Sequence, residues 1–304
     1  MPLTRLARTL TVFTCLATLT GCSLKTMAVK TVANTLSETG DVFSRDNDPE
    51  LVRDAIPFAL KLYESLLDSV PKHEPLLVAT CSGFTQYAYA FVQTEADLIR
   101  HEKVEEAAVL DERALKLYLR GRDYCLRALD LRFPGIQDRL LADAPAALAR
   151  AEKKDVPLLY WTAASWGSAV ALGPDRPELL IDFPSVRALI ERALALDETW
   201  NKGAIHEVLI TLESLETLGG SRDKARQHFA RAVELQGGKS PGPYVALATG
   251  VSAAAPQDRA EFEKLMNQAL AIDPEGDPST RLVTLIAQRR ARSLLANAGS
   301  IFSQ

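Results

Sequence analysis

Apolar residues recur at three- and four-residue spacing through most of this 304-residue chain, and that period constrains the fold more than any other feature. Such spacing places apolar side chains on one stripe of an α-helix, which must pack against another helix. Short breaks rich in Gly and Pro separate the segments that carry it: 56–70, 76–99, 105–132, 156–172, 185–197, 202–218, 222–236, 243–254, 258–272 and 279–298. Because no segment shows convincing β-strand alternation, the sequence predicts an all-α protein.

The first of these helices has a distinct start at Asp48. An Asp side chain can accept hydrogen bonds from the free NH groups of a first turn, and Pro49 suits the first helical position. Glu50 favours the positive end of the helix dipole. We therefore expect one helical domain over residues 48–304, preceded by a tether and a shorter helical pattern within residues 22–47.

Four of the helices end in a similar way, with an alanine followed by apolar residues: Ala128, Ala193, Ala232 and Ala269. The alanines are 65, 39 and 37 residues apart. A tetratricopeptide unit is a helix pair of ~34 residues in which a small alanine lets the two helices approach closely. The spacing thus predicts a tetratricopeptide-like solenoid of helical hairpins. A non-repetitive helical bundle is the alternative.

The N-terminus has the layout of a secretory signal. Arg5 and Arg8 precede an uncharged, mostly apolar run over residues 9–19, which is too short to span a bilayer. The run ends in Leu19-Thr20-Gly21-Cys22, which looks like a bacterial lipobox. Residues 1–21 are therefore predicted to be a lipoprotein signal peptide. An ordinary signal peptide with a chance cysteine is the alternative.

Lipidation at Cys22 would anchor the mature chain to a bilayer, because two or three acyl chains bind a membrane firmly. Ser23 follows the cysteine where an Asp would favour retention at the inner membrane. We therefore expect a periplasmic, lipid-anchored protein, with the inner face of the outer membrane favoured over the inner membrane.

The remaining cysteines are Cys81 and Cys125, since Cys15 leaves with the signal. In an oxidising compartment these two residues could form a disulfide. Both lie on helical patterns, however, and free cysteine is often a small buried hydrophobe. The sequence favours two buried thiols and leaves a disulfide as the alternative.

The sequence shows no motif for catalysis or cofactor binding. It has no phosphate-binding loop, dinucleotide fingerprint, nucleophile elbow or C-x-x-C pair. His206-Glu207 opens like a zinc-protease signature, but Ile210 stands in place of the second histidine. The mature chain has six more acidic than basic residues and no basic aromatic patch. We therefore expect no enzyme activity, no cofactor, no metal site and no nucleic-acid partner.

Aromatic residues are concentrated on two helices: Phe84, Tyr87 and Phe91 on one, and Tyr160, Trp161 and Trp166 on the other. Large aromatic faces either fill a core or bind an apolar ligand or a partner. With His206, these six residues form the candidate ligand or partner surface. A purely structural role in the core is the alternative for each of them.

Several segments resemble the TatT component of tripartite ATP-independent periplasmic (TRAP) transporters, which are extracytoplasmic lipoproteins with a tetratricopeptide-like fold. The most specific is the aromatic segment from Ser82 to Val92. The others are 40–43, 48–53, 57–61, 159–161, 203–207 and 288–292. Their order along the chain gives the resemblance its weight.

The resemblance implies a periplasmic partner, namely the solute-binding subunit of a TRAP transporter. It also implies a homo-oligomer, for example a trimer, and allows a hydrophobic small molecule as a ligand. An envelope scaffold that binds proteins without a transport role is the alternative function. The sequence identifies neither the transported substrate nor residues of proven function.

Overall fold

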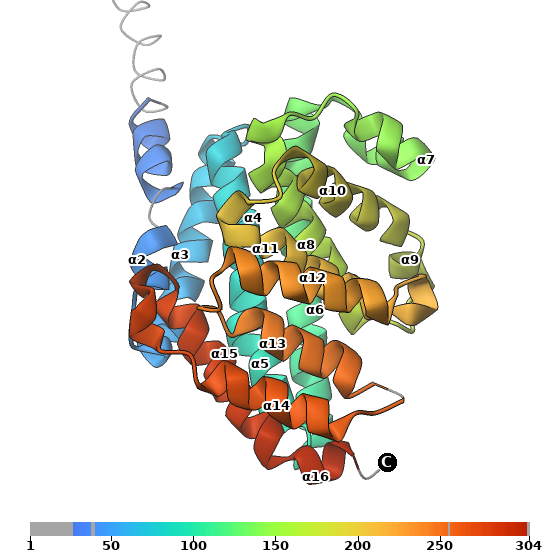
Figure 1. Cartoon of the computed structure of the whole chain (residues 1–304). Helices are drawn as coiled ribbons and strands as arrows, with labels where there is room; N and C mark the ends of the chain where they lie inside the picture. Colours follow the sequence, from blue (N-terminus) through green and yellow to red (C-terminus); the bar gives the residue numbers. More distant parts are fainter. Residues whose placement is uncertain (1–26, 38–39, 255, 303–304) are drawn as a thin grey trace, which may run out of the picture.

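The computed structural model describes residues 27–37, 40–254 and 256–302. Within these ranges the chain consists of helices and turns, with no β-strand, so the all-α prediction is confirmed (Figure 1). None of the helices in this part of the chain is long and apolar enough to cross a membrane. The predicted signal peptide and Cys22 lie outside the described residues.

The α-helices follow one another in this order: α2 Gly40–Ser44, α3 Pro49–Ser69, α4 Glu74–Tyr87, α5 Thr94–Ile99, α6 Val104–Arg132, α7 Ile136–Leu148, α8 Val156–Leu172, α9 Pro177–Leu180, α10 Phe183–Leu196, α11 Ala204–Glu213, α12 Arg222–Leu235, α13 Gly242–Leu247, α14 Arg259–Leu270, α15 Arg281–Ala296 and α16 Ala298–Ile301. Two short π-helices extend this set. The first, η1 (Ala88–Gln93), makes α4 continuous with α5, and the second, η5 (Ala248–Ser252), continues α13.

The start of α3 agrees with the sequence prediction. A carboxylate oxygen of Asp48 accepts hydrogen bonds from the backbone NH groups of Glu50 and Leu51, at 3.1 and 3.0 Å. Pro49 occupies the first helical position, where a missing NH costs nothing. Sequence reasoning missed α7, in which Asp143 leaves the helical conformation and Pro145 follows.

Helices in the body of the molecule pack in pairs. The four pairs are α4 with α6, α8 with α10, α11 with α12, and α13 with α14. The first helix of each pair contacts the first helix of the next pair. The four alanines that recur in the sequence lie near the ends of the second members and are fully buried: Ala128, Ala193, Ala232 and Ala269. A small side chain at these positions lets the paired helices approach closely.

Replacing these alanines tests that close contact. Ala193→Trp and Ala232→Trp are each expected to lower the free energy of unfolding by ~1 to 3 kcal/mol, because overpacking a filled core forces the helices apart. Ala195→Trp in α10 is the matched control, since Ala195 is exposed. Urea denaturation followed by circular dichroism measures all three. Unchanged stability in both buried variants would contradict the contact.

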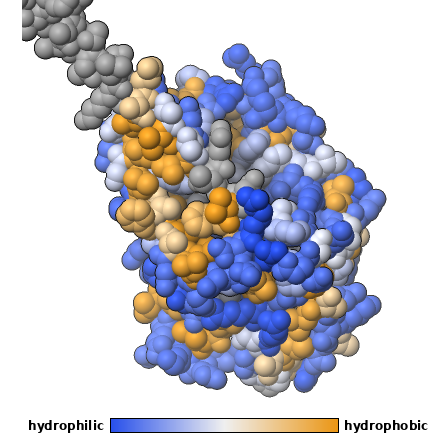
Figure 2. Space-filling view, turned by 90° about the vertical axis from the view of Figure 1, so that its left-hand side faces the viewer, coloured by the Kyte–Doolittle hydropathy of each residue, from blue (hydrophilic) through white to orange (hydrophobic). Residues whose placement is uncertain are grey.

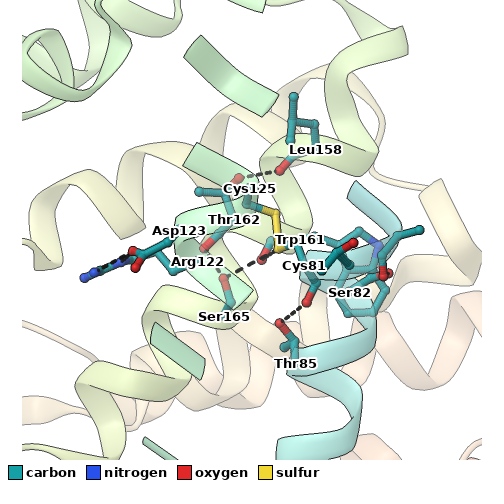
Figure 3. The surroundings of a disulfide bond; sticks show 12 residues. Cys81, Ser82, Thr85, Arg122, Asp123, Cys125, Leu158, Trp161, Thr162 and Ser165 are labelled. Atoms are coloured by element: carbon teal, nitrogen blue, oxygen red, sulfur yellow. Dashed lines mark hydrogen bonds and ion pairs between the residues drawn. A yellow bond between two sulfur atoms is a disulfide. The ribbon is translucent and has the colours of Figure 1, made fainter. Parts of the chain in front are cut away.

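A disulfide joins α4 to α6 (Figure 3). Cys81 and Cys125 are fully buried, and their Cα atoms lie 5.4 Å apart. The preference for two free thiols was therefore wrong, although their burial was predicted. Gly121 supplies the physical reason, because a Cβ atom there would lie 3.1 Å from the carbonyl oxygen of Cys81. Without that Cβ, the two helices come within reach of a disulfide.

The last long helix returns to the start of the chain. In Figure 1, α15 lies beside α5 and α2, and it contacts α2, α3 and α5. Val52 of α3 forms a small buried cluster with Leu282 and Ile286 of α15. The helix pairs thus close on themselves, and the two ends of the folded region stabilise one another.

Candidate functional site

Four residues of the predicted surface are buried, at 3 to 7% exposed: Phe84, Tyr87 and Trp166 lie in the hydrophobic core, and His206 is a buried polar residue. The ring of Phe84 stacks parallel to that of Tyr124, with centroids 6.0 Å apart. The indole nitrogen of Trp166 donates a hydrogen bond to Asp182 at 3.2 Å. Of the predicted surface, only Phe91, Tyr160 and Trp161 remain partly exposed.

Tyr160 and Trp161 remain partly exposed and form an aromatic cluster with Trp200. The ring centroid of Tyr160 lies 5.0 Å from that of Trp161 and 4.5 Å from that of Trp200. Trp200 belongs to the short 3-10 helix η3 (Trp200–Gly203), which leads into α11. Sequence reasoning missed Trp200, although it stands three residues before the segment 203–207 that carried the resemblance.

Glu207 lies on α11 near this cluster. Gln236 donates a hydrogen bond to its carboxylate, and no Lys or Arg of the described chain forms an ion pair with it. Gly242 leaves room for the carboxylate, because a Cβ there would collide with it. Burial raises the pKa of Glu207, and burial followed by the charge of Glu207 raises the pKa of Tyr160. Half-buried rings beside a carboxylate without a cation are suited to contact a partner or ligand.

His206 is the centre of a hydrogen-bonded chain between α11 and α12. Its Nε2 lies 3.2 Å from Glu198 and its Nδ1 lies 2.9 Å from Nδ1 of His228. Arg231 holds the pKa of Glu198 down at about 2, so this carboxylate accepts. His206 must therefore carry its proton on Nε2, and His228 donates from Nδ1. Within the described residues, no group of three or more His, Cys, Asp or Glu could hold a metal.

The buried pair His206 and His228 predicts that stability depends on pH. Burial lowers the pKa of both His206 and His228. In the unfolded protein these histidines titrate near 6.5. Below that pH the folded protein therefore binds fewer protons than the unfolded protein does. The stabilisation is present above pH ~6.5 and is lost as the pH falls. We expect the stability difference between the wild type and His228→Gln to shrink between pH 8 and pH 5.

The measurement is the free energy of unfolding in urea at each pH. Other groups face the pair and titrate or carry charge, namely Glu198, Glu213, Lys224, Arg187 and Arg231, so the difference between variants is compared rather than the absolute value. His101→Gln is the control, because His101 is exposed and distant from the pair in sequence. A difference that is independent of pH would contradict the assignment.

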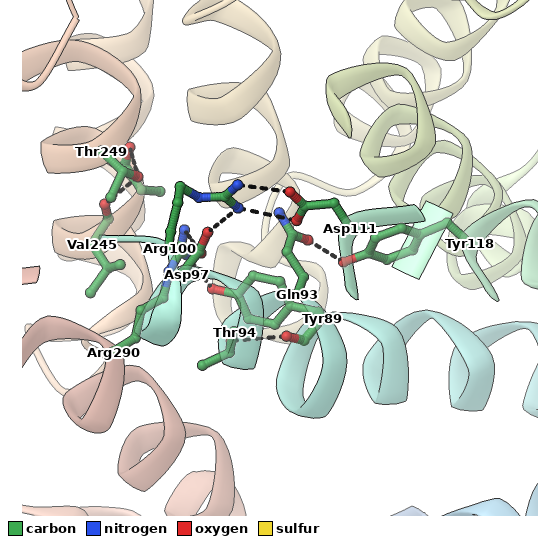
Figure 4. Close-up of polar contacts among 11 residues, drawn as sticks. Tyr89, Gln93, Thr94, Asp97, Arg100, Asp111, Tyr118, Val245, Thr249 and Arg290 are labelled. Carbon is green, nitrogen blue, oxygen red and sulfur yellow. Dashed lines mark hydrogen bonds and ion pairs between the residues drawn. The ribbon is translucent and has the colours of Figure 1, made fainter. Parts of the chain in front are cut away.

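A partly buried polar cluster joins α15 to α5 and α6 (Figure 4). Arg290 is 13% exposed and lies 2.7 Å from Asp97, whose other oxygen is 3.1 Å from Arg100. Arg100 in turn binds both carboxylate oxygens of Asp111, at 2.8 and 3.1 Å. Arg290 also donates to the hydroxyl of Tyr89 at 3.2 Å. This network of charges holds the C-terminal helix against the N-terminal half.

The π-helix η1 contributes side chains to this cluster. Tyr89 belongs to it, and so does Gln93, which accepts a 2.6 Å hydrogen bond from the hydroxyl of Tyr118. A π-helical turn widens the backbone, and the hydroxyl of Thr94 donates to the carbonyl oxygen of Tyr89 at 2.9 Å. Phe91, on the same turn, lines a cavity of only about 20 Å³, which has room for about one water-sized molecule.

Segments on which the family resemblance rests meet at two places, the contact of α15 with α3 and η1 and the aromatic cluster. Residues 48–53, 82–92 and 288–292 come together where α15 closes on α3 and η1, since Arg289 pairs with Glu50 at 3.2 Å and Arg290 contacts Tyr89. Residues 159–161 and 203–207 come together at the aromatic cluster. The fold therefore brings distant parts of the chain into two defined contacts.

Comparison with known proteins agrees with this placement. Residues 45–302 match the family described as TRAP transporter T-component. A protein of Treponema pallidum (strain Nichols), described as an uncharacterized protein, is 30% identical in an alignment of 302 residues that covers 93% of each chain. The family match includes both the aromatic cluster and the closure by α15. This chain belongs to the TRAP transporter T-component family.

Proposed function

We propose that this protein is an extracytoplasmic accessory lipoprotein of a TRAP transport system that binds the solute-binding subunit. The observation that carries the proposal is the family match over residues 45–302. The T-component family is a family of transporter components rather than of enzymes, which is consistent with a binding role. A homo-oligomer, for example a trimer, is part of the same proposal.

The architecture supports a binding role. We interpret residues 48–304 as one tetratricopeptide-like solenoid, because the recurring alanines are buried at equivalent places in four successive helix pairs. Stacked helix pairs present extended surfaces that bind partners without catalysis. The closure by α15 fixes the curvature of such a surface.

The partner surface that we propose is the aromatic cluster of Tyr160, Trp161 and Trp200 with Glu207. Its rings are partly exposed, and aromatic residues in such positions dominate the binding energy of many interfaces. Glu207 adds a hydrogen-bond acceptor that Gln236 only partly satisfies. A hydrophobic small molecule is the second ligand that this surface would suit.

Crosslinking in intact cells tests the partner. The tagged lipoprotein is purified from envelopes and the crosslinked proteins are identified by mass spectrometry. We expect the TRAP solute-binding subunit to be enriched with the wild type and lost with Trp161→Ala. Leu141→Ala is the matched control, because Leu141 is an exposed apolar residue on α7. Enrichment of other envelope proteins without that subunit would contradict the proposal.

The lipid anchor has its own prediction. Cys22→Ala should abolish lipidation, because only the thiol of Cys22 stands at the lipobox position that accepts the diacylglycerol. The variant is expected to fractionate as a soluble protein or to remain an unprocessed precursor. Mass spectrometry of the N-terminal peptide measures the modification. A variant that is still lipidated and processed would exclude the anchor.

A further inference from the structure

Exposed hydrophobic side chains are concentrated at the N-terminal end of the described chain. Five of the eleven large hydrophobic residues that are most exposed among the described residues fall within residues 27–58: Met27, Val32, Val42, Leu51 and Phe58. Phe58 is 75% exposed, more than any other of them. Figure 2 shows hydrophobic residues gathered on this face of the molecule. Apolar patches of this kind mark contacts with proteins or membranes.

Helix α3 supplies the most exposed part of this patch. Leu51 and Phe58 are seven residues apart and therefore share one face of the helix, together with Ala55 and Leu62. The opposite face, which includes Leu60 and Leu67, is buried in the core. The helix thus has a second apolar stripe, of which Leu51 and Phe58 are exposed and Ala55 and Leu62 are partly exposed.

Residues 27–37 are fixed alongside α3. The hydroxyl of Tyr63 donates to the carbonyl oxygen of Leu36 at 2.9 Å, and Asn34 lies 2.9 Å from a ring nitrogen of His73. Ala33 is fully buried against the core. These contacts set the point from which the chain leads back to Cys22. Since Cys22 precedes Met27 by five residues, the two are at most about 18 Å apart along an extended chain.

We propose that the outer stripe of α3, together with Met27, Val32 and Val42, rests on the surface of the lipid bilayer beside the anchor. This inference depends on the proposed acylation of Cys22, which would bring the bilayer within about 18 Å of residue 27. An amphipathic helix in such a place buries its apolar face at the boundary between headgroups and acyl chains. The bilayer is therefore the surface that this patch meets first.

The charges at the border of the stripe are compatible with such a contact. Arg53 pairs with Asp54 at 3.0 Å, and Lys61 pairs with Glu64 at 2.7 Å. Because these charges pair within the helix, both signs lie next to the stripe. Together they neither attract nor repel a zwitterionic membrane surface strongly. The apolar stripe then decides the orientation of the molecule on the membrane.

The test places the processed chain, residues 22–304, on phosphatidylcholine vesicles. Cys22 is the free thiol of that chain, because Cys81 and Cys125 form the disulfide. Coupling it to a lipid that carries a maleimide headgroup reproduces the anchor whether or not cells acylate Cys22. Failure of acylation in cells is therefore distinguishable from failure of this proposal.

The readout is tryptophan fluorescence in vesicles of brominated phosphatidylcholine, which quenches rings that enter the bilayer boundary. Phe58→Trp is compared with Leu141→Trp, whose position on α7 is 60% exposed and lies on the other side of the molecule from α3 (Figure 1). The parent chain with its three native tryptophans gives the baseline. Circular dichroism checks that both variants fold.

We expect bromination to reduce the emission added by Trp at position 58 by about twofold, because a residue on an interfacial helix face sits ~5 to 10 Å inside the boundary. The emission added at position 141 should remain unchanged. Equal quenching at both positions, or none at position 58, would overturn the proposal. Shielding of position 58 that depends on protein concentration in the absence of lipid would also overturn it and assign the stripe to a second copy.

Discussion

Arg290→Met is expected to lower the free energy of unfolding by about 2 to 3 kcal/mol, because it leaves the buried Oδ2 atom of Asp97 without its cation, while Arg100 still pairs with the other oxygen. The Arg290 side chain is 13% exposed and lies 2.7 Å from Asp97, which is 15% exposed. Methionine keeps the apolar stem, so the loss reports the charge. Urea denaturation measures the change, and hydrogen exchange of the α15 amides shows whether this helix opens first.

Arg289→Met is the matched control at the neighbouring position. Arg289 is 48% exposed, and its ion pairs with Glu50 and Glu95 are both 3.2 Å long. Exposed pairs of this kind contribute ~0 to 1 kcal/mol. Equal stability losses in the two variants would show that the polar cluster around Arg290 does not hold α15 in place.

Removal of the disulfide is expected to have the second large effect. Cys81 and Cys125 are 44 residues apart, and the chain-entropy relation gives about 4 kcal/mol for closing a loop of that length. The double variant Cys81→Ala/Cys125→Ala should therefore lose about 3 to 4 kcal/mol of stability. Alanine is tolerated in the core, so the loss reports mainly the crosslink.

Reduction provides the corresponding measurement on the unchanged sequence. Dithiothreitol is expected to lower the melting temperature of the wild type to that of the double variant, and to leave the melting temperature of the double variant unchanged. A wild type that melts at the same temperature with and without the reductant would contradict a stabilising disulfide.

The sequence predicted those features that depend on local chemistry. The helical period identified most helices, Asp48 marked the start of α3, and the recurring alanines proved to be fully buried. In α7 the local signal failed, because Asp143 and Pro145 interrupt the helical pattern that a period search requires.

Contacts between distant segments could not be predicted from one sequence. The disulfide depends on the close approach of α4 and α6 at Gly121, which no local pattern reveals. The pair between Glu95 and Arg289 joins residues 194 positions apart. The predicted surface residues ended up partly buried and partly exposed for the same reason. Helix periodicity shows which residues share a face, but it does not show which face another helix covers. Trp161 stayed partly exposed, whereas Phe84 and Trp166 were buried.

The affinity between the purified protein and the solute-binding subunit of its TRAP system tests the central claim most directly. We predict saturable binding in biolayer interferometry, weakened about tenfold or more by Trp161→Ala, as expected for an aromatic side chain at the centre of an interface. Leu141→Ala should bind like the wild type. A wild-type protein with native circular dichroism that shows no saturable binding to this subunit would contradict the account.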